Sequence, residues 1–255
     1  MPNDYFAFKA FTIWQDRTAM KVTTDACLFG AWVSKRIQEM YSSYDHLITK
    51  PQRAADVGTG TGLLSLMLHQ KNPDILLEGI EIDPQAAEQA RENIAKAGAA
   101  KQIKIYEADA TAFMASAPYD IIISNPPFYK DDLKATRPKK NWAFHEETLS
   151  LSALLGFISK QLLTEGDFFL MLPYRREQEL MEQLPHYALL LTEKILVRPA
   201  PFSPPHRLLI AGKRKEVMDQ KPAPLFTVQE LIIATETGAY SNPFRELLSD
   251  YYLSC

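Results

Sequence analysis

Short apolar runs alternate with amphipathic stretches along the chain from about residue 53 onward. Runs with the length and composition of buried strands lie at 53–60, 75–83, 103–109, 119–127 and 167–173. Stretches that predict helices lie at 63–70, 84–98, 150–166 and 177–185. This alternation predicts a largely parallel sheet that is covered by helices on both faces.

The C-terminal part of the chain adds a different pattern. Two apolar runs, 188–200 and 207–215, predict an antiparallel pair of strands, and residues 227–253 predict a helical tail. The expected fold class is therefore α/β, with a seven-stranded, mostly parallel sheet that includes this C-terminal antiparallel pair.

The N-terminal residues 1–45 precede the first strand of this sheet. Thr24 and Asp25 stand where the N-cap of a helix is expected. Ala26, Phe29, Gly30 and Val33 follow at the spacing of one helix face, which predicts that this helix packs on the core.

Length and composition narrow the class of protein. The 255 residues, of which 46% are hydrophobic and 23% charged, suit one globular α/β domain. No apolar run approaches the ~18 residues of a membrane span, and the N-terminus lacks a signal-peptide pattern. The two cysteines, Cys27 and Cys255, argue against a disulfide framework or a zinc site. We expect a cytoplasmic monomer without a metal, in which the net charge of −3 leaves nucleic-acid binding to a local basic face.

A glycine loop follows the first predicted strand. Gly58, Gly60 and Gly62 occupy every second position of the segment that joins this strand to a helix. Glycine lets the backbone turn sharply there and lets a ligand lie directly against it. A dinucleotide loop needs its third glycine at position 63, which is leucine, and this disfavours an NAD-dependent oxidoreductase. Together with Asp56, the loop resembles the S-adenosylmethionine loop of class I methyltransferases, which have a Rossmann-like fold.

Acidic residues end the next two strands. Glu81 lies about 20 residues beyond the glycines, where a carboxylate can accept both hydroxyls of a ribose. Asp109 ends the third strand and is suitably placed to accept from an adenine amino group. Either residue alone could simply cap a helix, and Asp83 beside Pro84 is better explained in that way. The three consecutive strand ends together predict a site for S-adenosylmethionine.

The fourth strand ends in Asn125, Pro126, Pro127 and Phe128. A pair of prolines often does no more than end a strand. Asn-Pro-Pro followed by an aromatic residue, however, resembles the motif of methyltransferases that act on planar amide or aromatic amine nitrogens. The amine lone pair is delocalised into the ring, so it needs acceptors for its hydrogens. The Asn125 side-chain oxygen and the Pro126 carbonyl can supply them, while Phe128 stacks on an extruded base.

Two terminal segments extend this resemblance along most of the chain. They are the pattern F-x-F-K-x-F, D-R-x-A-M-K-V, T-D and L-x-G-A-W within residues 6–32, and the tail AYSNPFRELLSDYY at 239–252. With the glycine loop and NPPF, they are similar to the bacterial tRNA1(Val) adenine-N6 methyltransferases. The resemblance implies a single methyltransferase domain, with residues 1–45 as an extension that contributes to the cofactor and RNA sites and 46–255 as the core.

The same resemblance implies adenosine 37 of a valine tRNA as the substrate and places further residues. Thr24 would help to close the cofactor site, and Lys9, Arg17 and Lys21 would lie near the RNA entry. The basic and aromatic stretch after NPPF adds candidates that suit phosphate binding and base stacking. These candidates are Tyr129, Lys130, Lys139, Lys140 and Trp142.

Three alternatives stay open at this point. Related enzymes with this strand-end motif methylate rRNA guanine N2 or protein glutamine N5, and the identity of the methyl acceptor separates them from an adenine-N6 enzyme. The third is a non-catalytic RNA-binding protein on a methyltransferase fold, although the intact glycine loop and Asn125 disfavour it.

Overall fold

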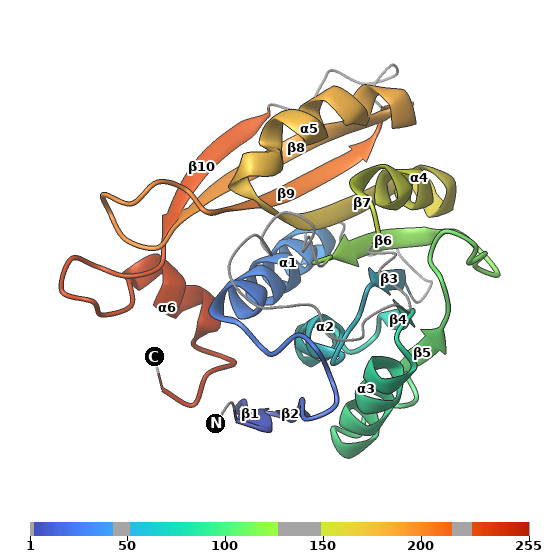
Figure 1. Cartoon of the computed structure of the whole chain (residues 1–255), viewed down its shortest axis with the longest axis horizontal. Coiled ribbons are helices and arrows are strands. Elements are labelled where there is room, and N and C mark those ends of the chain that lie inside the picture. Colours follow the sequence, from blue (N-terminus) through green and yellow to red (C-terminus); the bar gives the residue numbers. More distant parts are fainter. Residues whose placement is uncertain (1–2, 43–51, 127–148, 216–225, 255) are drawn as a thin grey trace, which may run out of the picture.

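The computed structural model describes residues 3–42, 52–126, 149–215 and 226–254. Its main element is an eight-stranded sheet in the order β10-β8-β9-β7-β6-β3-β4-β5 (Figure 1). The strands are β3 (Arg53–Val57), β4 (Leu76–Glu81), β5 (Ile103–Glu107), β6 (Tyr119–Ser124), β7 (Leu162–Pro173), β8 (Leu189–Arg198), β9 (Arg207–Arg214) and β10 (Thr227–Ile232). A separate small sheet pairs β1 (Tyr5–Ala7) with β2 (Thr12–Trp14).

The direction of the strands determines which ends meet at one edge. β9 runs antiparallel to both of its neighbours, β7 and β8, while the other pairings in the main sheet are parallel. The carboxyl ends of β3, β4, β5, β6, β7 and β8 therefore lie at the same edge, and β9 starts there. The predicted α/β class and the antiparallel pair of β8 and β9 are confirmed.

Helices cover both faces of the sheet, and each face has its own apolar core. The helices on one face are α1 (Thr24–Ser42), α2 (Leu63–Lys71), α3 (Pro84–Lys96) and α6 (Asn242–Leu248). The helices on the other face are α4 (Leu151–Gln161) and α5 (Glu177–Gln183), and the short 3-10 helices η2 (Tyr174–Arg176) and η3 (Leu184–Tyr187) flank α5. No helix in these described ranges is long and apolar enough to cross a membrane.

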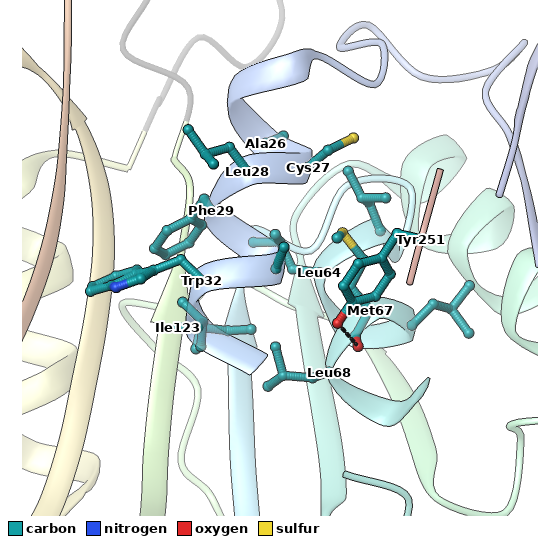
Figure 2. Close-up of a cluster of buried hydrophobic side chains, with 14 of the residues drawn as sticks. Ala26, Cys27, Leu28, Phe29, Trp32, Leu64, Met67, Leu68, Ile123 and Tyr251 are labelled. Carbon is teal, nitrogen blue, oxygen red and sulfur yellow. Dashed lines mark hydrogen bonds between the residues drawn. The ribbon is translucent and has the colours of Figure 1, made fainter. Parts of the chain in front are cut away.

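Helix α1 packs tightly between the sheet and α2. Figure 2 shows its side chains Phe29 and Trp32 in one apolar cluster with Met67 of α2 and Tyr251 from the C-terminal part of the chain. A Cβ atom added at Gly30 would lie 2.6 Å from Sδ of Met67, so the glycine permits the close approach of α1 to α2. The helix face predicted from the sequence is thus buried.

The segment around Lys9 is tied to the C-terminal part of the chain. The backbone N–H of Lys9 donates to the carbonyl oxygen of Tyr251 at 2.8 Å, and its ammonium group donates to the carbonyl oxygen of Ser249 at 2.5 Å. The rings of Phe8 and Tyr252 lie 6.1 Å apart between centroids. These contacts fix the start of the chain against residues more than 200 positions away.

Three predictions of local structure were wrong. Residues 162–166, which were expected to end a helix, are the start of strand β7, because α4 ends at Gln161. Residues 227–232 form strand β10 and not the start of a helical tail, so the sheet has eight strands where seven were expected. Parallel pairing of this segment with β8 overrides its helical pattern, as tertiary contacts often do. The tail is helical at α6. The side chain that caps α1 is that of Thr23, whose hydroxyl accepts from the backbone N–H of Ala26 at 3.2 Å, and not that of Thr24 or Asp25.

Candidate active site

A cavity of about 540 Å³ opens at the carboxyl ends of β3, β4 and β6. This volume lies in the range of small-molecule sites, and the edge is the one where parallel sheets bind ligands. Of the predicted site residues, those that line the cavity come from five different segments. They are Lys21, Gly58, Gly60, Glu81, Asp109, Asn125 and Pro126. Residues that directly follow the parallel strands in the sequence therefore lie together around one cavity.

The glycine loop has the backbone conformation that its composition predicts. Gly58, Gly60 and Gly62 have φ angles of 73°, 56° and 81°, in the left-handed region that other residues rarely adopt. A Cβ atom at Gly58 or Gly60 would meet no atom within 4 Å among the described residues, so the backbone angle and not lack of space requires glycine.

Glu81 connects the end of β4 to the glycine loop. Its Oε2 accepts from the backbone N–H of Gly60 at 2.8 Å, and its Oε1 accepts from that of Asp83 at 3.0 Å. Burial raises the pKa of Glu81 despite these bonds. Each carboxylate oxygen has more than one lone pair, so Glu81 can still accept the two hydroxyls of a ribose.

Asp56 lies behind the loop and is not among the residues that line the cavity. It is fully buried, and its Oδ2 accepts from the hydroxyls of Thr59 at 2.7 Å and Ser65 at 2.8 Å. Burial raises the pKa of Asp56 to about 6, although the two hydroxyl bonds favour the ionised form. The carboxylate thus holds the loop to the start of α2 from the side that faces the core.

The end of β6 is fixed against β3. The Ser124 hydroxyl donates to the carbonyl oxygen of Val57 at 2.6 Å, in the register that pairs these two residues. Asn125 is half-buried and Pro126 is buried, and both line the cavity beside the glycine loop. Pro127 and Phe128 lie outside the described residues.

Asp109 follows β5 and also lines the cavity. Its Oδ1 accepts from the backbone N–H of Thr111 at 2.8 Å, which orients the carboxylate. Asp83 is the N-cap of α3, where its side chain accepts from the N–H of Gln85, as the sequence suggested.

The N-terminal segment forms one wall of the cavity through Thr18, Ala19, Met20, Lys21, Val22, Thr23 and Ala26. Two buried amide side chains of α3 hold this segment in place. Asn93 accepts from the N–H of Trp14 at 2.9 Å and donates to its carbonyl oxygen at 2.8 Å, and Gln89 accepts from the N–H of Arg17 at 3.1 Å.

Some predicted residues of the N-terminal segment lie away from the cavity. Thr24, Lys9 and Arg17 are not among the lining residues. Arg17 forms an ion pair with Glu92 of α3, whereas Lys21 lines the cavity and donates to the carbonyl oxygen of Gln15. The other predicted RNA contacts, Tyr129, Lys130, Lys139, Lys140 and Trp142, lie outside the described residues.

Several lining residues were missed by the sequence analysis. Thr18, Met20 and Thr23 bring polar and thioether groups to the cavity, and Ser150 and Ala153 reach it from the start of α4. The helix-capping signal at Thr23 could have been found from the sequence, but its nearness to the glycine loop could not. Within the described ranges, no group of three or more His, Cys, Asp or Glu side chains could hold a metal ion.

Fold and site together define a class I methyltransferase. Two solved structures share the fold with TM-scores near 0.6. A predicted O-methyltransferase from Agrobacterium tumefaciens has a TM-score of 0.61 at 18% identity and covers 88% of this chain and 95% of its own. A putative class I S-adenosylmethionine-dependent methyltransferase from Listeria monocytogenes has a TM-score of 0.60 at 15% identity, over 80% of this chain and 64% of its own. Residues 42–149 also match the family described as the methyltransferase small domain.

Sequence relatives narrow this class to one family. The chain is 39% identical to the tRNA1(Val) (adenine(37)-N6)-methyltransferase of Parabacteroides distasonis over 99% of both chains. It is 35% identical to the protein of that name from Dyadobacter fermentans over 98% of both chains, and 32% identical to that of Proteus mirabilis over 97% of this chain and 93% of the relative. The chain belongs to the tRNA1(Val) (adenine(37)-N6)-methyltransferase family, whose cofactor is S-adenosylmethionine.

Replacing Gly60 with Ala is expected to weaken cofactor binding. An alanine in this left-handed conformation would destabilise the loop by roughly 1–2 kcal/mol. Relaxation of the loop would move the backbone N–H of residue 60, which donates a hydrogen bond to Glu81. We expect the Kd for S-adenosylhomocysteine, measured by calorimetry, to rise about 10-fold. Gly98 has a φ of 74° but does not line the cavity, so Gly98→Ala is the matched control that lowers stability alone. Equal cofactor affinity in both variants would contradict the assigned role of the loop.

Proposed function

We propose that this chain transfers the methyl group of S-adenosylmethionine to the exocyclic N6 of adenine in RNA, at adenosine 37 of a valine tRNA. The observation that carries the proposal is the position of Asn125 and Pro126, which line the same cavity as the glycine loop and Glu81. The names of the relatives supply the tRNA and the position of the adenosine.

The cofactor would be held by the ends of the first three core strands. Gly58 and Gly60 expose bare backbone to it, Glu81 offers lone pairs to its ribose hydroxyls, and Asp109 offers a carboxylate to its adenine amino group, whereas Gly62 does not line the cavity. When bound, S-adenosylmethionine supplies an electrophilic methyl group on a sulfonium. The lining residues fit this molecule, because they combine acceptors for its polar groups with apolar walls at Leu63 and Ile80.

Asn125 and Pro126 would prepare the target amine. The Asn125 side-chain oxygen and the Pro126 carbonyl oxygen accept the two amine hydrogens and stabilise the positive charge that develops on nitrogen. Proline has no N–H, so no donor of Pro126 competes for these oxygens. Most of the rate enhancement would come from positioning, since the amine and the methyl group are held in one cavity. Phe128 is proposed to stack on the base.

The test uses labelled S-adenosylmethionine and purified protein with unmodified valine tRNA. We expect label in N6-methyladenosine on nucleoside mass analysis, and no label when adenosine 37 is replaced by guanosine. Ribosomal RNA and protein extract serve as the other acceptors. Label in guanine or glutamine would overturn the acceptor, and the absence of transfer to any acceptor despite cofactor binding would favour a non-catalytic RNA-binding protein.

A further inference from the structure

The loop between β8 and β9, residues 199–206, lies at the edge of the sheet that carries the cavity. β8 ends and β9 begins at this edge, because Val197 pairs with Arg207 next to the end of β7. In the sheet order, β9 is two positions from β6, which ends at the cavity. Neighbouring strands are about 4.8 Å apart, so the start of β9 is roughly 10 Å from Asn125. Figure 1 shows this loop in orange beyond the end of β8.

The loop is held in one shape by prolines and hydrogen bonds. Its sequence, PAPFSPPH, has proline at positions 199, 201, 204 and 205, and proline restricts φ. The N–H of Ser203 donates to the carbonyl oxygen of Ala200 at 3.1 Å and closes a turn with Pro201 and Phe202 at its centre. Arg198 donates to the carbonyl oxygen of Ser203 at 2.7 Å. Its side chain also pairs with Glu230 of β10, so the loop is anchored at its base.

Phe202 is placed at the tip of this stiff loop with 88% of its surface exposed. Burying a phenylalanine side chain contributes about 1.5–3 kcal/mol to folding, and this position forgoes that contribution. A second aromatic residue, Tyr174, follows β7 at the same edge and is 38% exposed. Its N–H donates to the carbonyl oxygen of His206 at 3.1 Å, which links the two aromatic positions through the backbone. The edge therefore presents flat apolar rings to solvent.

A cluster of polar and charged side chains lies at the base of the same loop. Nε2 of His206 lies 3.0 Å from Oδ1 of Asp25, and its Nδ1 lies 3.1 Å from the carbonyl oxygen of Val197. Nε of Arg207 donates to Oδ2 of Asp25 at 3.1 Å. The Asp25 carboxylate at the start of α1 thus contacts both His206 and Arg207.

Asp25 stays ionised in this cluster. Its burial opposes ionisation, but the hydrogen bonds and charges of His206 and Arg207 hold the pKa of Asp25 below its usual range. The guanidinium of Arg207 has five N–H donors, and its hydrogen bond to Asp25 uses one of them. Arg207 is 37% exposed and can therefore donate to a phosphate as well.

We propose that this edge binds single-stranded RNA, with Phe202 stacking on an unpaired base and with Arg207 donating to a phosphate beside it. Exposed aromatic rings interleaved with cations are the combination that holds unpaired nucleotides. The loop leaves the sheet at the edge where Asn125 lines the cavity, so the stacked base would belong to the RNA that enters the cavity. The inference rests on the proposed function, since it supplies a contact for the same RNA.

The test measures the Kd of the full chain for a labelled anticodon stem-loop RNA by fluorescence anisotropy. We expect Phe202→Ala to raise this Kd about 5- to 100-fold, which is the effect of losing one base stack. Phe202→Trp should keep the affinity, whereas Phe202→Leu, which is apolar but not aromatic, should lose it. Because Phe202 is exposed, these variants are expected to fold as the wild type does. Phe226, 45% exposed at the start of β10, provides the matched control Phe226→Ala.

Two further readouts separate this inference from the proposed function. Arg207→Gln should lower the slope of log Kd against log salt by about one, and Phe202→Ala should raise KM for the stem-loop while kcat changes little. Binding that depends on Phe202 without methyl transfer by the wild type would overturn the proposed function alone. Equal Kd values for wild type and Phe202→Ala, or no stem-loop binding by the wild type, would overturn the inference.

Discussion

Asn125→Ala is expected to lower kcat for methyl transfer by about 100- to 1,000-fold, the usual effect of removing one group that stabilises developing charge. The alanine takes away an acceptor for an amine hydrogen at the wall of the cavity. Asn125→Asp keeps an oxygen acceptor at that position and should retain more activity than the alanine variant. The rate is measured in single turnovers with tRNA and cofactor both saturating.

Cofactor affinity shows whether the loss of kcat arises in the methyl-transfer step or from weaker cofactor binding. Asn125 lies beside the glycine loop, so we expect its removal to change the Kd for S-adenosylhomocysteine far less than it changes kcat. Asn242 is exposed at the start of α6 and does not line the cavity, which makes Asn242→Ala the matched control. If Asn125→Ala keeps the wild-type kcat, Asn125 has no role in the proposed methyl transfer.

Asp56→Asn is expected to make the folded protein less sensitive to pH. In the folded state the pKa of Asp56 is raised to about 6 from an ordinary 3.8, so between these values the folded protein keeps a proton that the unfolded chain has lost. The free energy of unfolding of the wild type therefore falls as pH rises through this window. The pKa difference corresponds to roughly 3 kcal/mol. Asparagine does not ionise, and its side-chain oxygen can still accept from Thr59 and Ser65.

Denaturant unfolding at pH 4 and at pH 7 measures this effect. The stability of Asp56→Asn relative to wild type should increase by roughly 2 kcal/mol between the two pH values, because more than half of the unfolded chains have already lost this proton at pH 4. Asp74 is exposed, and Asp74→Asn should change by less than about 0.5 kcal/mol over the same interval. If the difference in unfolding free energy between Asp56→Asn and wild type is the same at both pH values, Asp56 ionises at little cost in the folded protein. That result would contradict the effect expected from its full burial.

The sequence predicts the parts of the site that follow a local rule. Parallel strands end at one edge of the sheet, so residues that directly follow strands, such as Gly58, Glu81, Asp109 and Asn125, can be placed together without a structure. The alternation of strands and helices was sufficient for the fold class for the same reason. The spacing of the glycines also predicted a sharp backbone turn, and the structure has all three in the left-handed region.

Features that depend on distant pairing were missed. Strand β10 forms by parallel pairing with the edge of β8. Nothing in the sequence of residues 227–232 alone predicts this pairing. No local sequence signal marks His206 as a partner of Asp25, which lies 181 positions away in the chain. The hydrogen bonds of Asn93 that place the N-terminal wall of the cavity are likewise invisible in a linear pattern.

The contact between Lys9 and residues 249–252 has a consequence for synthesis. Their backbone hydrogen bond joins positions 9 and 251, and the N-terminal segment that begins there continues into the wall of the cavity. At 5–20 residues per second, a ribosome needs roughly 10–50 s to make the intervening chain. Throughout that time the apolar side chains of the first segment lack their C-terminal partners. The nascent chain therefore cannot complete the packing of its N-terminal segment until translation is nearly finished.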